Sequence, residues 1–420
     1  MAKPRTRSRT KVEDFTGSPA VRQVLHELED IRGKEFSDIV DDAGHQYVDL
    51  VMEGGGVLGI ALVGYTYVLE EMGIRFLGVG GTSAGSINAM LLAALAPREQ
   101  KKSPRTLELL ANLDMYSFVD GDDDARDFIR AALSGAGRFK LALKLAQVVD
   151  NFDDHLGLNP GDVFHHWLTV ALKGAGIHTL ADLNERLAAT PPGLRRRDGR
   201  PLRDGDADGY LALVAAEITT ETKVEFPRMA PLFWAEPDRV NPADFVRASM
   251  SIPFFFHPFR VTDIPQGQEA WERWNQLAGY RGPIPLECVF VDGGIMSNFP
   301  IDLFHQPNRV PTAPTFGVKL GTDRNRVRDV DGIGRFAGAI FDSARHCLDY
   351  DFIRRNPDYR RLVQEIDTRD HHWLNFEMTA ERRIDLFGLG ARAAGEFLKA
   401  FDWAQYKEVR RQLAGAFQVA

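Results

Sequence analysis

Residues 46–97, QYVDLVMEGGGVLGIALVGYTYVLEEMGIRFLGVGGTSAGSINAMLLAALAP, decide the fold. The stretch contains one pattern twice: a short β-branched and aromatic run, a Gly-rich turn, and an apolar segment of helical length. The runs Gln46–Met52 and Arg75–Thr82 predict two strands, with turns at 53–59 and 83–86. The second turn and helix follow their strand without a spacer, so this unit is expected deep in the core.

Three more short apolar runs between turn-forming residues are predicted strands, at Tyr210–Thr219, Glu287–Val291 and Thr315–Leu320. Strands separated by long helical stretches indicate an α/β fold with a mostly parallel sheet that helices cover on both faces. From about Arg335 the sequence becomes helical and charge-mixed, which predicts a helical C-terminal cover. Two polar stretches, Arg195–Gly209 and Asp263–Gly282, are predicted surface insertions.

Composition narrows the class of protein. The chain has 420 residues, of which 44% are hydrophobic and 26% are charged, as in ordinary globular proteins. A formal net charge of −8 argues against a general nucleic-acid binder, which needs a basic surface. No run reaches the ~18 apolar residues of a membrane span. Cys288 and Cys347 fit neither a disulfide framework nor a metal-ligand spacing, so a cytoplasmic, reducing location is expected.

Gly81–Gly85 (GTSAG) is a G-x-S-x-G pentapeptide that lies directly between a predicted strand and a predicted helix. In such a turn the serine is held on a sharp bend with its hydroxyl exposed, and the flanking glycines relieve crowding. The pattern indicates that Ser83 is a catalytic nucleophile. The alternative is that Ser83 is only the N-cap of the helix, a position that serine often takes.

The glycine loop Gly54–Gly59 admits two functional interpretations, because GGGVLG also satisfies the dinucleotide fingerprint G-x-G-x-x-G. That fingerprint expects an acidic residue about 20 positions on, at the end of the second strand, but Val79–Ser83 contains none. We therefore expect the loop to offer backbone N–H groups to an oxyanion formed at Ser83, each worth roughly 3 to 4 kcal/mol of barrier. A purely structural tight turn stays as an alternative.

A nucleophilic serine needs a proton acceptor, and the usual one is a histidine oriented by a carboxylate. None of the downstream histidines, from His155 to His372, lies on a convincing strand-end loop. Asp292–Gly294 (DGG) directly follows the predicted strand Glu287–Val291, at the carboxyl edge where active sites of such sheets lie. Asp292 is therefore the better candidate, although Asp-Gly also forms ordinary turns.

Together these residues resemble the patatin-like phospholipase family, whose members use a Ser-Asp dyad without histidine. A fourth family block, Ala-Ser-x-Ser-x-Pro, is matched by Ala248–Pro253, and the four blocks occur in the family order. The resemblance assigns Ser83 and Asp292 as the catalytic dyad, Gly54, Gly55, Gly56 and Ala84 as the oxyanion hole, and Gly59, Gly81, Gly85, Gly293 and Gly294 as motif-supporting residues.

Two positions depart from the family pattern. Many members have Asp before the glycines and a basic residue before the last glycine, whereas this chain has Glu53 and Leu58. The first change is mild. The second removes a cation from the loop, which leaves backbone amides and the helix N-terminus as the expected oxyanion stabilisers.

The resemblance implies a three-layer fold with a mostly parallel central sheet flanked by helices. The catalytic domain is expected at 46–325, after a basic tail and helical lead-in at 1–45 and before a helical C-terminal cover at 326–420. The implied activity is that of a serine lipid acyl hydrolase, similar to phospholipase A or lysophospholipase, with no metal and no cofactor. The expected partner is an acyl-lipid substrate and not a nucleic acid, with peripheral membrane contact and an unidentified activator left open.

Other function classes account for less of the sequence. A dinucleotide-binding oxidoreductase would explain one loop only. A catalytically silent lipid-binding or scaffold protein would keep the fold without needing Ser83 and Asp292 together. The presence of both residues favours the enzyme.

Several segments keep two interpretations each. Arg138–Val149 has a wide apolar arc that fits either a core helix or a lid that meets the membrane. Phe254–Phe256 fits either the core or the wall of an acyl site. The basic stretch Lys3–Lys11 is expected to be a solvated tail, with anionic lipid as the alternative ligand. The acidic runs Asp122–Asp124 and Asp153–Asp154 lack EF-hand spacing and are expected to be solvated loops.

Overall fold

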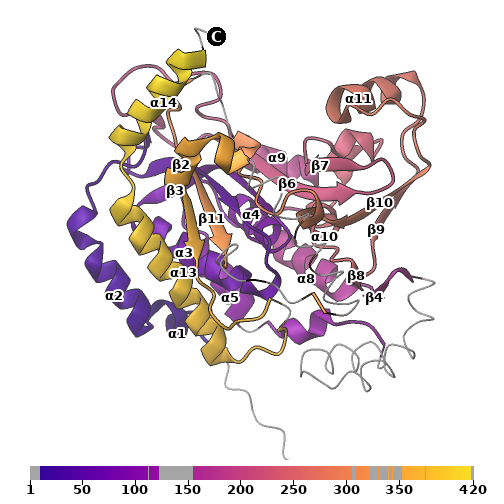
Figure 1. Cartoon of the computed structure of the whole chain (residues 1–420), viewed down its shortest axis with the longest axis horizontal. Helices are drawn as coiled ribbons and strands as arrows, with labels where there is room; N and C mark the ends of the chain where they lie inside the picture. The colour runs from indigo at the N-terminus through magenta and orange to yellow at the C-terminus, as the bar shows by residue number, and fades with distance from the viewer. Residues whose placement is uncertain are drawn as a thin grey trace, which may run out of the picture.

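A ten-stranded sheet forms the centre of the molecule (Figure 1). The computed structural model describes residues 10–111, 113–122, 155–304, 309–321, 352–373 and 375–417, with single positions between 327 and 343. The strands of this sheet are β1 (Ile39–Val40), β2 (Gln46–Met52), β3 (Ile74–Thr82), β5 (Arg195–Arg196), β6 (Tyr210–Glu217), β7 (Thr222–Phe226), β9 (Phe259–Thr262), β10 (Glu287–Asp292), β11 (Thr315–Leu320) and β12 (Val363–Ile366). A separate parallel pair consists of β4 (Gly157–Asn159) and β8 (Phe254–Phe256).

The strand order is β12-β11-β2-β3-β6-β10-β9. The neighbours from β12 to β6 are parallel, whereas β10 is antiparallel to both β6 and β9, and β7 is antiparallel to β6. The predicted α/β class with a mostly parallel central sheet is confirmed. All five predicted strands are present within two residues of their expected bounds.

Side chains of successive strand residues point to opposite faces, and both faces of the sheet are covered. In β3 a Cβ added to Gly80 would meet Leu303, whereas a Cβ added to Gly81 would meet Gly85 at the start of α4. The 3₁₀ turn Ile301–Phe304 therefore covers one face, and α4 covers the other. β3 is buried over its whole length, as its glycine-rich and apolar sequence predicted.

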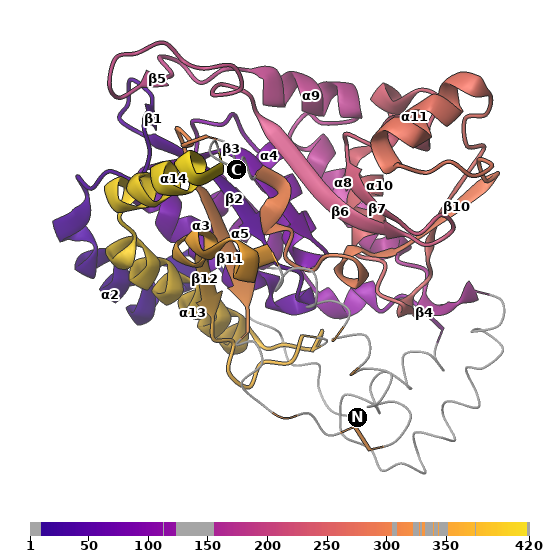
Figure 2. The same cartoon turned by 45° about the horizontal axis from the view of Figure 1, so that its top comes forward.

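The helices complete the layers on either side of the sheet, and α11 lies on the opposite side of the molecule from α13 and α14 (Figures 1 and 2). The long helix α13 packs along α3 and α2. The described helices are α1 (Val12–Thr16), α2 (Pro19–Glu27), α3 (Gly59–Glu71), α4 (Ala84–Ala94), α5 (Ser103–Ala111), α8 (Asp162–Lys173), α9 (Leu180–Ala188), α10 (Pro242–Ser249), α11 (Gln268–Ala278), α13 (Ala380–Ala400) and α14 (Trp403–Phe417).

The predicted helices of the C-terminal region are confirmed, but the region also contributes a strand. β12 pairs in parallel with β11 and so extends the main sheet. A strand as short as Val363–Ile366 gives little periodicity, which is why the sequence indicated only helices there. The proposed domain boundaries at 45/46 and 325/326 stay predictions.

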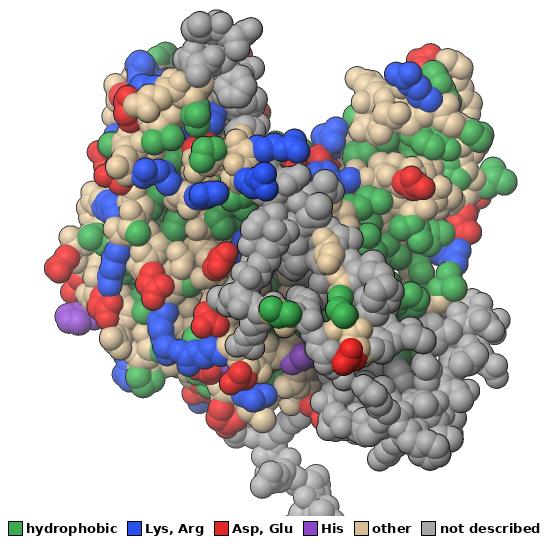
Figure 3. Space-filling model, in the orientation of Figure 1, with side chains coloured by type: hydrophobic (Ala, Val, Ile, Leu, Met, Phe, Trp, Pro, Cys, Tyr) green, Lys and Arg blue, Asp and Glu red, His purple; other side chains and the backbone are tan. Residues whose placement is uncertain are grey.

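The stretch Asp263–Gly282, predicted to be a surface insertion, lies mostly at the surface but also contains a helix. It contains α11, and the indole of Trp274 in that helix is fully buried against Phe233 with ring centroids 5.3 Å apart. Figure 3 shows the lobe around α11 standing apart from the rest of the body across a notch. Trp274 and Phe233 belong to the large hydrophobic core of the molecule, so the lobe is attached to the body through that core.

Candidate active site

The C-terminal ends of β3 and β10 meet on the same edge of β6. This brings the predicted nucleophile and the predicted base to one place. β7 pairs with one edge of β6 from Leu213 to Glu217, so the other edge is left for both β3 and β10. On that edge Thr82, the last residue of β3, lies opposite Val214. Asp292, the last residue of β10, lies opposite the next residue, Ala215. Ser83 and Asp292 thus flank the point where two strand ends meet.

This arrangement corrects the reasoning from the sequence. Asp292 was expected at the common carboxyl edge of parallel strands, but β10 runs antiparallel to β6. Asp292 reaches the end of β3 because β10 runs toward it from the opposite direction. A close approach at this junction also explains the glycine that follows, since a Cβ on Gly293 would lie 2.0 Å from the Val214 oxygen.

Ser83 has the backbone of a sharp elbow. Its φ is +53° and its ψ is −119°, a conformation that costs a non-glycine residue on the order of 1 to 3 kcal/mol. α4 begins at the next residue, and the Ser83 carbonyl accepts the N–H of Ser86 (2.9 Å) and of Ile87 (3.2 Å). Ser83 is therefore also the N-cap residue, so the interpretation as an N-cap and the interpretation as an elbow describe the same geometry.

The Ala248–Pro253 block holds both halves of the junction. The Ser249 hydroxyl accepts the N–H of Ser83 (3.0 Å) and donates to the Val214 oxygen (2.6 Å). The Ser251 carbonyl accepts the N–H of Asp292 (2.8 Å). The Asp292 carboxylate accepts the N–H of Gly294 (2.8 Å), which fixes the turn after β10. One short segment therefore sets the relative position of the elbow and the carboxylate.

The glycine loop lies against the elbow, but the N–H groups of its three consecutive glycines differ in their hydrogen bonding. The N–H of Gly54 donates to the carbonyl of Asn298 at 3.0 Å, so this predicted oxyanion donor is already occupied. The N–H groups of Gly55 and Gly56 donate to no described residue. A Cβ on Gly54 would lie 3.1 Å from the Ser83 Cβ, which shows how closely the loop approaches the elbow.

Two buried side chains hold the loop: Glu53, and Asn298, which no motif singled out. The Asn298 amide donates to the Glu53 carboxylate (3.1 Å) and to the Gly54 carbonyl (3.3 Å). The other Glu53 oxygen accepts the N–H of Leu320 in β11 (2.6 Å). Glu53 was predicted to be a mild departure from Asp. Its longer side chain reaches both Asn298 and β11, and Leu58, which replaces a cation, is buried.

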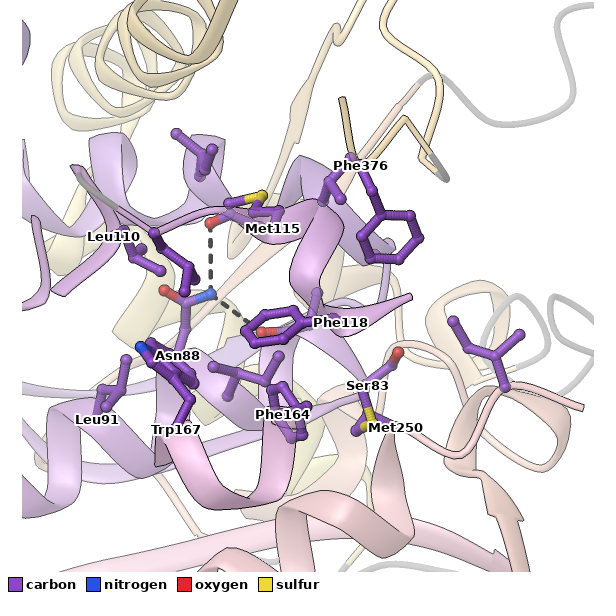
Figure 4. A pocket seen from close by; sticks show the side chains of 18 of the residues that line it. Ser83, Asn88, Leu91, Leu110, Met115, Phe118, Phe164, Trp167, Met250 and Phe376 are labelled. Atoms are coloured by element: carbon purple, nitrogen blue, oxygen red, sulfur yellow. Dashed lines mark hydrogen bonds between the residues drawn. The ribbon is translucent and has the colours of Figure 1, made fainter. Parts of the chain in front are cut away.

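An apolar pocket opens beside Ser83 (Figure 4). The cavity itself is small, about 80 Å³, and it continues into space that is open to solvent. Ser83, Asn88 and the indole N–H of Trp167 are the polar side-chain groups among its described lining residues, which include no histidine. The apolar wall includes Leu91, Leu110, Met115, Phe118, Phe164 and Trp167.

Segments distant in the sequence complete the pocket. Phe256 of the Phe254–Phe256 run lines it, Phe255 stacks on Phe376 (ring centroids 5.2 Å apart), and Phe254 is exposed. The run therefore serves both the core and the pocket wall. Phe376 also lines the pocket, and the nearby Trp373 carbonyl accepts the N–H of Val57 in the glycine loop (3.0 Å). No sequence motif indicated Phe376 or Trp373.

The described histidines that pair with carboxylates lie outside the pocket. His45 pairs with Asp41 (2.8 Å), and His371 pairs with Asp385 (3.0 Å). His165 of the predicted His165–His166 helical run lies in α8 and contacts Asp244. None of these three histidines lines the pocket, whereas Asp292 lies opposite Ala215 in β6, one position along from Val214, the partner of Thr82.

A family model described as patatin-like phospholipase matches residues 50–305, and the chain belongs to this family. The predicted resemblance is confirmed. The matched range contains the elbow, the glycine loop and the DGG segment, and it ends before β11, β12 and the residues Trp373 and Phe376. Membership supports the hydrolysis of lipid acyl esters.

Individual proteins match this chain in sequence or in structure. The chain is 29% identical over 363 residues to the uncharacterized protein YqhO of Bacillus subtilis, covering 85% of this chain and 100% of that protein. It is similar to VipD of Legionella pneumophila, with 15% identity, a TM-score of 0.41, and 87% and 70% of the two chains covered. It is also similar to ExoU of Pseudomonas aeruginosa, in a structure with SpcU, with 14% identity, a TM-score of 0.36, and 84% and 52% covered.

Several predictions fall outside the described residues. These include the candidate membrane helix Arg138–Val149, the acidic residues Asp123, Asp124, Asp153 and Asp154, nearly all of the basic tail, and Cys347. Cys288 is a buried free thiol. In the part of the chain that the structure describes, no helix is long and apolar enough to cross a membrane. No group of three or more His, Cys, Asp or Glu side chains among those residues is arranged to hold a metal ion.

Proposed function

We propose that this protein is a serine lipid acyl hydrolase that acts through Ser83 and Asp292. The observation that carries the proposal is the head-to-head meeting of β3 and β10 on β6, which puts an elbow serine and a carboxylate together beside an apolar pocket. A dinucleotide site is not favoured, because Val79–Ser83 ends in the elbow and contributes no carboxylate for a ribose.

In the proposed first step, Ser83 Oγ attacks the carbonyl carbon of the ester while its proton passes to Asp292. The carbonyl oxygen becomes an oxyanion, and we assign its stabilisation to the N–H groups of Gly55, Gly56 and Ala84. Gly54 is left out of this set because Asn298 already accepts its N–H. Collapse of the intermediate breaks the bond to the alcohol, which takes the proton from Asp292.

In the second step, a water molecule attacks the acyl-serine and gives its proton to Asp292. The fatty acid leaves, and the proton returns to Ser83 Oγ. An unperturbed aspartate has a pKa of about 3.9 and is a weak base at neutral pH. The dyad therefore relies on fixed positions and on the oxyanion donors for much of the reduction in barrier.

The substrate class follows from the pocket wall. An acyl chain placed with its carbonyl at Ser83 would run along α4, since Ala84, Ile87, Asn88 and Leu91 form one helical face of the pocket. Membrane lipids carry such chains, so we propose a phospholipase A or lysophospholipase-like activity with peripheral membrane contact from the cytoplasm.

The test uses a fluorophosphonate probe and release of fatty acid from mixed phospholipid vesicles. The wild type should be labelled and active, Ser83→Ala should be neither, and Asp292→Asn should keep its melting temperature while losing turnover by orders of magnitude. His155→Ala and His257→Ala serve as matched controls and should keep activity. A folded histidine variant as inactive as Ser83→Ala, or equal labelling of wild type and Ser83→Ala, would refute the dyad.

A further inference from the structure

We infer that the pocket is built for an acyl chain that carries a hydroxyl group, and that Asn88 recognises this hydroxyl. The inference rests on the proposed function, because it assumes that Ser83 attacks the ester of that chain. It goes beyond that function by naming the substrate class. It is argued from the position of the Asn88 amide in a pocket whose other side chains, apart from Ser83 and the indole N–H of Trp167, are apolar.

Asn88 lies halfway along the pocket. The pocket face of α4 consists of Ala84, Ile87, Asn88 and Leu91, and Asn88 follows Ser83 by five residues. At a rise of 1.5 Å per residue, its Cα is about 7.5 Å further along the helix axis than that of Ser83. A group at this depth meets the middle of an acyl chain and not the ester.

The amide of Asn88 has a fixed orientation. Its Nδ2 donates to the Ala84 carbonyl (3.0 Å) and to the Gly59 carbonyl (3.3 Å), which Figure 4 marks with dashed lines. Turning the amide over would place its oxygen against two carbonyl oxygens, so the pair of acceptors determines which atom is the nitrogen. The side chain is 6% exposed and has little room to move.

The amide oxygen of Asn88, unlike its nitrogen, makes no hydrogen bond to a described residue. Figure 4 shows it directed away from the two carbonyls, on the side of Leu110. Within the described part of the chain no group donates to it. Polar atoms in an interior are almost always hydrogen-bonded, and leaving an acceptor under an apolar chain costs about 1 to 3 kcal/mol. A plain acyl chain would bury this oxygen without a donor.

A hydroxyl on the chain supplies the missing donor. Asn88 has no charge, so it would not attract a cation, and the apolar residues around it accept the rest of the chain. One hydrogen bond to a fixed acceptor is expected to favour the hydroxylated chain by about tenfold. The discrimination should be largest when the hydroxyl lies in the middle of the chain.

The experiment compares kcat/KM for p-nitrophenyl dodecanoate and for its monohydroxy derivatives, with the hydroxyl moved along the chain. The wild type should prefer one mid-chain derivative over the plain ester by about tenfold. Asn88→Leu should abolish or reverse this ratio while still hydrolysing the plain ester. Ile87→Val, on the same pocket face, should change kcat/KM for the plain and the hydroxylated esters by the same factor, so their ratio should stay as in the wild type.

A purely structural role of Asn88, as a tie between α4 and α3, predicts a different result. Asn88→Leu would then lower stability and both rates together, with no change in the ratio. That outcome, or a wild type that hydrolyses all the esters equally, would overturn the inference. Absence of all hydrolysis and of fluorophosphonate labelling would instead overturn the proposed function.

A second measurement uses the wild type alone, in case Asn88→Leu does not fold. Free dodecanoic acid and its hydroxylated derivatives compete with the fluorophosphonate probe for the pocket. The mid-chain hydroxy acid should protect Ser83 from labelling at about a tenth of the concentration that the plain acid requires. Equal protection by the two acids would count against recognition by Asn88.

Discussion

Replacing Ser249 by Ala tests whether the elbow depends on a hydroxyl from a different segment. Ser249 is fully buried, and its hydroxyl accepts the N–H of Ser83 and donates to the Val214 carbonyl. In Ser249→Ala the Ser83 N–H keeps no acceptor in the interior. A buried donor left without a partner costs about 1 to 3 kcal/mol, so the free energy of unfolding should fall by about that amount.

The effect on activity should exceed the effect on stability. The positive φ of Ser83 persists only because its surroundings hold it, and the Ser249 hydroxyl is one of the groups that do so. Without it the elbow can relax, and the Ser83 hydroxyl moves relative to Asp292 and the glycine loop. A misplacement of ~1 Å can cost about a hundredfold in rate, so labelling by a fluorophosphonate should slow by tenfold to about a hundredfold.

Ser251→Ala is the matched control from the same block. Ser251 is also fully buried, but among the described residues its hydroxyl bonds only to Arg247, accepting from the guanidinium (2.5 Å) and donating to the carbonyl (2.7 Å). Its own carbonyl, which accepts the N–H of Asp292, is unchanged by the substitution. Chemical denaturation should show similar losses for the two variants, whereas only Ser249→Ala should be slow in labelling. Wild-type labelling of Ser249→Ala, or equal slowing in both variants, would contradict the reasoning.

Three further predictions concern the sheet and its surroundings. Gly56→Ala should lower stability by about 1 to 3 kcal/mol, because φ is +55° and the added Cβ would lie 2.3 Å from the Trp373 carbonyl oxygen. Gly64→Ala should destabilise by about as much, since its Cβ would lie 2.0 Å from the Phe387 carbonyl oxygen at the α3–α13 crossing. Burial raises the pKa of Asp49 from 3.8 to about 7, so the folded state holds a proton that the unfolded state has lost between these values. The stabilising effect of that proton is present at low pH and lost as the pH rises through 7, so Asp49→Asn should gain stability relative to the wild type between pH 4 and pH 8 in thermal melts.

Each of these predictions has a control. Gly55 has an extended φ of −178°, and a Cβ there would meet only the Leu320 side chain, so Gly55→Ala should cost less stability than Gly56→Ala. A Cβ on Gly388 would meet Ala20 at an ordinary 3.4 Å, so Gly388→Ala should be mild beside Gly64→Ala. If both variants of a pair lost the same stability, the contacts with the Trp373 and Phe387 carbonyl oxygens would not be the cause of the loss. If the melting temperatures of Asp49→Asn and wild type differed by the same amount at every pH, Asp49 would not titrate as described.

The local parts of the fold could be predicted from the sequence because their signals are local. Gln46–Met52 and Thr315–Leu320 are strands with the expected bounds, and the turn at Ser83 was placed between a strand and a helix. In each case a few consecutive residues contain the apolar run and the turn residues that decide the conformation. The direction of β10 was not decided in this way, because a five-residue apolar run is compatible with parallel and antiparallel pairing.

The supporting contacts of the site could not be predicted, because each joins residues far apart in the chain. Asn298 reaches Glu53 across 245 positions. No periodicity or motif spacing contains the information that these two side chains meet. The same holds for Ser249, whose family block was recognised although its hydrogen bond to the elbow was not.

The pocket shows how far the functional unit extends beyond the matched family region. Phe376 lines the pocket and Trp373 holds the glycine loop, yet both lie after residue 305. Both residues lie in the segment between β12 and α13. β12 pairs in the main sheet, and α13 packs on α3, the helix that follows the glycine loop. Because one end of this segment is held by the main sheet and the other by α3, its position is coupled to that of the loop. A chain cut after residue 305 would therefore lose part of the pocket wall and a contact of the proposed oxyanion loop, even though all four sequence blocks would remain.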